Sequence, residues 1–90
     1  MKIQIHFNEI NETVDVQDAA EALSKLKAEA AARAPLLLRG VIKHFGDVQF
    51  AQEAVKRDNL AQSTNDPLPG TAQEFLDWAV RKGYATILER

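Results

Sequence analysis

Histidines are the first residues to inspect for chemistry, because an imidazole titrates near neutral pH and also binds metals. The chain contains two, His6 and His44. Neither lies at metal-ligand spacing from a second histidine or from a pair of carboxylates. Asp47 follows His44 closely enough to orient its ring, but the start of a helix explains an aspartate there sufficiently. The sequence therefore predicts no catalytic, cofactor or metal site, and an enzyme that uses His44 or His6 is the least favoured hypothesis.

Trp78 is the most informative side chain for binding. On a helix it lies about 100° from Ala79, at the flank of the apolar face. Tryptophan is enriched at binding hot spots because it combines a large apolar area with a donor. Two interpretations stay open: Trp78 belongs to an interaction surface, or it packs in the core beneath the loop 58–70. Tyr84 is a second interaction candidate, with the apolar contact of a helix C-cap as its alternative.

Basic side chains supply the other interaction candidates. They are Arg39, Lys43, His44, Arg81 and Lys82. If these side chains converge, they form a patch that suits the phosphates of a nucleic acid. Those at a helix C-terminus already have an explanation, because positive charge there complements the helix dipole.

Composition limits the classes of function. The 90 residues, 1–90, are expected to form a single domain, with 46% hydrophobic and 27% charged residues. Eleven basic residues stand against 13 acidic ones, so the net charge of -2 gives no field that would hold a polyanion or an anionic membrane. Cysteine is absent, which fits a reducing compartment. Without an apolar run of about 20 residues or a signal peptide, we expect a cytoplasmic protein with no membrane partner.

The N-terminus has the pattern of a β-hairpin. Ile3, Ile5 and Phe7 alternate with polar residues, which predicts a strand with one buried face. The stretch from Ile10 to Val16 alternates again and predicts a second strand. Glu12 interrupts its apolar face, so we expect the ladder to begin at about Thr13.

Two helices are predicted next. Asp18 is a capping residue with Glu21 three positions later, and the Ala-rich segment continues as a helix to Arg33. Along it, opposite charges recur four residues apart, which predicts a solvated stripe of ion pairs. Pro35 suits the first turn of a second helix that reaches Phe45 with a strong apolar face.

A change of helical phase occurs at Gly46. We expect the second helix to end there and a third to begin with Asp47 as its N-cap, while a short strand over 47–51 is the alternative. The segment 58–70 contains two prolines and predicts a long loop. Leu60 and Leu68 are the residues expected to pin this loop to the body.

The C-terminal part is the most clearly marked. Thr71 and Glu74 form a capping box that starts a helix at Ala72. Gly83 supplies the left-handed residue that ends it. The aromatic and β-branched segment 84–88 predicts a strand, which must pair with an earlier strand because an isolated strand is unstable.

Together these elements predict an α+β fold: a small three-stranded sheet, made of the N-terminal hairpin and the C-terminal strand, packed on one face by three to four helices. The last strand is expected beside the first, which leaves two open sheet edges. The favoured function is a small non-catalytic module that binds a protein partner, with homo-oligomerisation through an open edge as one form of this. The alternative is an accessory protein that binds nucleic acid.

Overall fold

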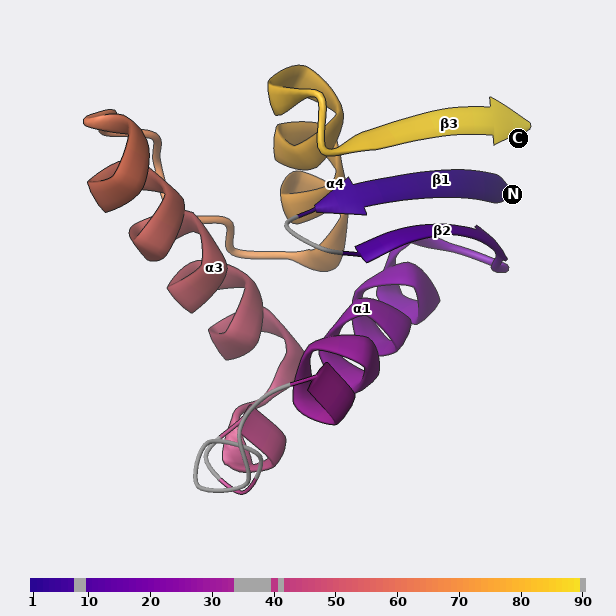
Figure 1. Ribbon diagram of the computed structural model, residues 1–90, viewed down its shortest axis with the longest axis horizontal. Helices are drawn as coiled ribbons and strands as arrows, with labels where there is room; N and C mark the ends of the chain where they lie inside the picture. Colours follow the sequence, from indigo (N-terminus) through magenta and orange to yellow (C-terminus); the bar gives the residue numbers. More distant parts are fainter. Residues whose placement is uncertain (8–9, 34–39, 41, 90) are drawn as a thin grey trace.

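A three-stranded antiparallel sheet in the order β2-β1-β3 forms one layer of this α+β fold (Figure 1). The structure is a computed structural model that describes residues 1–7, 10–33, 40 and 42–89. The elements are β1 (Lys2–Phe7), β2 (Ile10–Asp15), α1 (Ala19–Arg33), α3 (Asp47–Gln62), α4 (Ala72–Lys82) and β3 (Ala85–Glu89). The predicted fold class is confirmed, and so is the central position of β1, which pairs with both other strands.

The hairpin ladder begins earlier than predicted. It starts with the pair formed by Phe7 and Ile10 and includes Glu12, so the expected start at Thr13 is wrong. Glu12 fits on the helix-facing side because its carboxylate lies 4.0 Å from the Arg33 guanidinium at the end of α1. A half-buried acid with a cationic partner can therefore replace an apolar residue in the strand.

Helix α1 has the predicted bounds and the predicted cap. The Asp18 carboxylate accepts a hydrogen bond from the Glu21 amide at 2.9 Å. The charged stripe forms in two pairs, with nitrogen to oxygen distances of 4.0 Å for Lys25 and Glu21 and 3.5 Å for Arg33 and Glu29.

The predicted helix from Pro35 to Phe45 lies largely outside the described residues, although 40 and 42–44 are helical. The break at Gly46 is confirmed, but the N-cap of α3 is Gly46 itself, so Asp47 is a first-turn residue and not the cap. Instead of capping, the Asp47 carboxylate lies 3.4 Å from the Lys27 ammonium group of α1. The alternative of a strand over 47–51 is wrong, because this segment is the first part of α3.

Helix α3 also extends further than predicted. It continues to Gln62 and ends at Ser63, which adopts the left-handed conformation, so the part 58–62 of the expected loop 58–70 is helical. The predicted pins are wrong, since Leu60 and Leu68 are 84% and 42% exposed. Polar contacts hold the connection between α3 and α4 instead.

Helix α4 begins at Ala72 and ends before Gly83, as predicted. Thr71 accepts the expected hydrogen bond from the Glu74 amide at 3.1 Å. The predicted reciprocal bond of the capping box is wrong, because the Glu74 carboxylate accepts from the Gly70 amide and not from that of Thr71. Gly83 has φ 83°, a value that favours glycine, and its backbone closes the helix. This sharp end directs the chain straight into β3.

The core lies between the helices and one face of the sheet. Ile3 and Ile5 of β1, 1% and 7% exposed, pack with apolar residues of α1 and α4. The side chain of Phe7, predicted in the same row, lies outside the described part of the structure. Helix α3 packs mainly on α1 and α4 and stands away from the sheet (Figure 1). The other face of the sheet is polar. The described helices leave this face and the two edges of the sheet uncovered.

Candidate functional site

Trp78 lies in the core and not at the surface. It is 2% exposed, and its ring centroid lies 5.6 Å from Phe75 and 5.5 Å from Tyr84. Its indole nitrogen donates a hydrogen bond to Asp66 at 3.1 Å. Of the two interpretations left open by the sequence, the structure supports packing beneath the loop, so Trp78 offers no exposed area to a partner.

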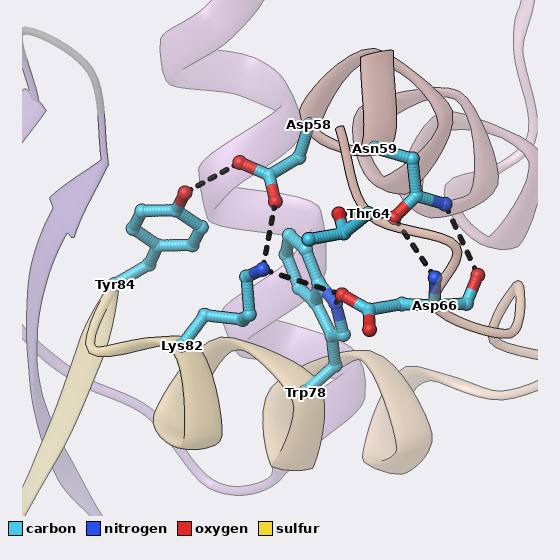
Figure 2. Close-up of polar contacts among 7 residues, drawn as sticks. All are labelled: Asp58, Asn59, Thr64, Asp66, Trp78, Lys82 and Tyr84. Atoms are coloured by element: carbon cyan, nitrogen blue, oxygen red, sulfur yellow. Dashed lines mark hydrogen bonds and ion pairs between the residues drawn. The ribbon is translucent and has the colours of Figure 1, made fainter. Parts of the chain in front are cut away.

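Asp58 is the buried charge around which a polar network forms. Its exposed fraction is 9%, and one carboxylate oxygen accepts a hydrogen bond from the Tyr84 hydroxyl (Figure 2). The other oxygen, Oδ2, accepts no hydrogen bond within the described residues but lies 3.4 Å from the Lys82 ammonium group. A buried carboxylate is expensive unless it is paired, so Tyr84 and Lys82 make this position of α3 tolerable.

Lys82 joins the two acids of the network. Its ammonium group also lies 3.4 Å from Asp66 Oδ2, the same oxygen that accepts from Trp78. Figure 2 shows Lys82 between Asp58 of α3 and Asp66 of the loop. These two ion pairs connect the last turn of α4 to α3 and to the loop that contains Asp66.

Asn59 fixes the loop from the other side. Its side chain donates to the Asp66 carbonyl at 3.1 Å and accepts from the Asp66 amide at 3.0 Å. Thr64 adds a hydrogen bond to the same Asn59 oxygen at 2.9 Å. Nearer α4, Gln52 donates to the Pro69 carbonyl at 3.0 Å. These contacts, and not Leu60 or Leu68, hold the loop to α3.

The electrostatics of the network favour one fixed protonation state. The hydrogen bond from Trp78 lowers the pKa of Asp66 below its usual 3.8, against a smaller opposing effect of burial. Burial acts to lower the pKa of Lys82, but its polar and ionic interactions with the carboxylates of Asp66 and Asp58 outweigh this effect and raise that pKa above 10.5. The hydrogen bond to Asp58, helped by burial, raises the pKa of Tyr84 above 10.0.

At neutral pH the lysine is thus charged, the tyrosine is neutral and Asp66 is ionised. A nucleophilic amine or phenolate requires the opposite shifts. This arrangement stabilises the packing of three segments, and we assign it a structural role.

The network was not predicted, although Tyr84 and Lys82 were singled out separately. One signal was present: Asp58 lies on the same helical face as Ala51 and Val55, both 0% exposed. An acid on a buried stripe requires a partner, but the sequence does not show that Tyr84, 26 positions away, provides it.

Among the described residues, the predicted basic side chains do not gather into one patch. Lys82 is committed to two carboxylates. Arg39 lies outside the described residues. Lys43 and His44 are exposed on the helical segment before α3, and Arg81 is exposed on α4. The distance between those two elements in the fold gives no support to a single phosphate-binding surface (Figure 1).

The histidines also lie apart. His6 is half-buried on the polar face of the sheet, 3.3 Å from the Thr86 hydroxyl, whereas His44 is exposed. Among the described residues no group of three or more His, Asp or Glu side chains is placed to hold a metal ion. None of the described helices is long and apolar enough to cross a lipid bilayer.

A shallow groove lies beside β3. It has a volume of about 440 Å³ and is lined by Val80 and Gly83 at the end of α4 and by the strand residues 85–89. Its exposed apolar side chains are Val80, 40% exposed, and Leu88, 51% exposed. Exposed apolar side chains beside an open strand are a recurrent feature of peptide-binding surfaces.

The open edge of β3 contributes backbone groups to the same groove. His6 donates its amide to the Tyr84 carbonyl at 2.9 Å, which sets the phase of the antiparallel ladder. With Thr86 opposite Gln4, the backbone groups of Ala85 and Ile87 point away from β1. Since no described strand lies beyond β3, these groups have no partner within the sheet (Figure 1).

The two edges of the sheet differ in character. Strand β2 carries Glu12 and Asp15, and charged side chains discourage the addition of another strand. Strand β3 is uncharged from Ala85 to Leu88, and a bulge at Leu88 interrupts its regular pairing with β1. The segment 85–87 is therefore the regular, uncharged edge that the fold leaves open.

Comparison with models of protein families, with curated proteins and with solved structures found no match to this chain.

Proposed function

We propose that this protein is an interaction module that binds an extended segment along the open edge of β3. The observation that carries the proposal is the coincidence of unpaired strand backbone, at Ala85 and Ile87, with an apolar groove wall, at Val80. Backbone groups of an edge strand match those of another extended chain and provide affinity. The groove then provides selectivity through the side chains it accepts.

The helix beside the groove is well placed for this role. Helix α4 is fixed at its N-terminus by the Thr71 cap and at its last turn by Lys82. Its position relative to β3 is set by Gly83. A rigid wall reduces the ordering cost of binding, so the polar network supports the groove without contacting the bound segment.

Substitution of Val80 by lysine tests the site. Bait protein carrying Val80→Lys is compared with the unmodified chain in capture from a lysate of the native host. A charge on the groove wall would be buried without a partner by a bound strand, so we expect captured protein to fall by at least about tenfold. The fold itself should tolerate the change, because Val80 is 40% exposed and lysine is a good helix former.

Leu60→Lys is the matched control. It makes the same kind of substitution at an exposed apolar position of a helix, 84% exposed, which does not line the groove. We expect it to capture the same proteins as the unmodified chain. If Val80→Lys retains them equally, the groove is not the binding site.

A further inference from the structure

The open edge of β3 is complementary to itself. In β3 the backbone amide and carbonyl groups of Ala85 and Ile87 point away from β1. An added antiparallel strand can bond to all of these groups if it presents the same arrangement, which is two residues, two positions apart, whose backbone groups point towards β3. We therefore propose that the segment bound along β3 is β3 of a second copy of this chain, in antiparallel register about Thr86. This inference rests on the proposed function and names its partner.

In this register Ala85 faces Ile87 of the second copy, and Ile87 faces Ala85 of the second copy. Each facing pair exchanges two backbone hydrogen bonds, so the outward donors and acceptors of both edges are satisfied. The side chains also match in size, since a small buried residue, 6% exposed, lies opposite a large apolar one that is half-buried. Self-complementarity of this kind is what a two-fold interface requires.

Thr86 lies at the centre of the pairing, opposite Thr86 of the second copy. Its side chain is exposed on the polar face of the sheet, where it contacts His6. Facing threonines are a favourable pair in antiparallel sheets. They occupy a position without direct backbone hydrogen bonds, where facing side chains approach most closely.

Charge does not oppose this association. The segment 85–88 is uncharged, and the carboxylate of Glu89 lies 3.8 Å from the Lys2 ammonium group of its own chain. The other edge, β2, carries the acids Glu12 and Asp15, and charged side chains on an edge strand discourage pairing with another strand. The uncharged β3 is therefore the edge that suits a second copy.

A single cysteine tests the register. The chain has no cysteine, so Thr86→Cys introduces one thiol that can form a disulfide only between copies. The control is Thr13→Cys, because Thr13 is also exposed and also pairs with Gln4, but from the β2 side. Under mild oxidation we expect the disulfide-linked dimer to form about tenfold faster with Thr86→Cys, since the register holds these thiols together.

Sedimentation of the unmodified chain provides the second measurement. We expect the average mass to rise from the 10.0 kDa of the monomer towards twice that value as concentration increases. A monomeric mass at every concentration, or equal oxidation rates for the two cysteine variants, overturns the second-copy proposal. If Val80→Lys still loses captured protein in that case, the groove binds a different strand and only the identity of the partner was wrong.

Discussion

Replacement of Trp78 by alanine distinguishes a core residue from an interface residue. The indole is 2% exposed, contacts two aromatic rings and donates to Asp66. Removal of such a side chain leaves a cavity and costs about 3–5 kcal/mol. The total stability expected of a small domain is only about 5–15 kcal/mol, so a large part of it depends on this one residue.

The thermal midpoint should fall by about 12–40 °C, because each kcal/mol shifts a domain of this size by about 4–8 °C. Far-ultraviolet circular dichroism is the suitable assay, since the substitution removes the only tryptophan and with it the fluorescence signal. Leu60→Ala is the control: at 84% exposure it should change stability by no more than about 0.5 kcal/mol. A loss below about 1 kcal/mol for Trp78→Ala would refute the core assignment.

Two further predictions concern the polar network. Tyr84→Phe leaves an oxygen of buried Asp58 without its donor and should cost about 1–3 kcal/mol in urea unfolding; no measurable loss would show that water replaces the hydroxyl. Stability should also fall at both ends of the pH scale. Because the pKa of Asp66 is lowered in the folded state, its contribution is present above pH 3.8 and is lost as pH falls below that value; Asp66→Asn should flatten this acid limb. The pKa values of Lys82 and Tyr84 are raised, so their contributions are present below 10.5 and 10.0 and are lost at higher pH. Unfolding midpoints measured against pH check both limbs, and an acid limb unchanged in Asp66→Asn would contradict the assignment.

Local signals predicted the elements well. The caps at Asp18, Thr71 and Gly83 act within one turn of helix, so the sequence contains both partners of each interaction. The alternation of Ile3 and Ile5 likewise predicted the buried face of β1. The instability of a lone strand predicted that the C-terminal strand pairs with an earlier one. Its place beside β1 was predicted because a central β1 buries its apolar row best, and the strand order confirms it.

Predictions failed where partners are distant in sequence. Glu12 was expected to delay the start of the β2 ladder, but it fits on the helix-facing side, where the Arg33 guanidinium of α1 lies 4.0 Å from its carboxylate. Asp58 was taken as the start of a loop, whereas Tyr84 and Lys82 allow α3 to continue with this acid buried. In each case the sequence suggested that a charged residue would end a regular element. The residue is accommodated because the tertiary fold brings a polar or charged partner to it.

The site was less accessible to sequence reasoning than the fold. Trp78 was chosen as a candidate because of its residue type. The binding surface we propose consists instead of the Val80 side chain and the outward backbone groups of Ala85 and Ile87 in β3. Backbone groups carry no signature in the sequence. An open edge was predicted, but its phase relative to β1 depends on the register of the sheet.

Amide hydrogen exchange of β3 tests the open edge most directly. In dilute solution the amides of Ala85 and Ile87 should exchange rapidly, while that of Thr86, which points towards β1, should be protected. At high protein concentration Ala85 and Ile87 should become protected as the edge is occupied, with Thr86 little changed. Protection of Ala85 and Ile87 already in the dilute monomer, or exchange that does not depend on concentration, would contradict the account.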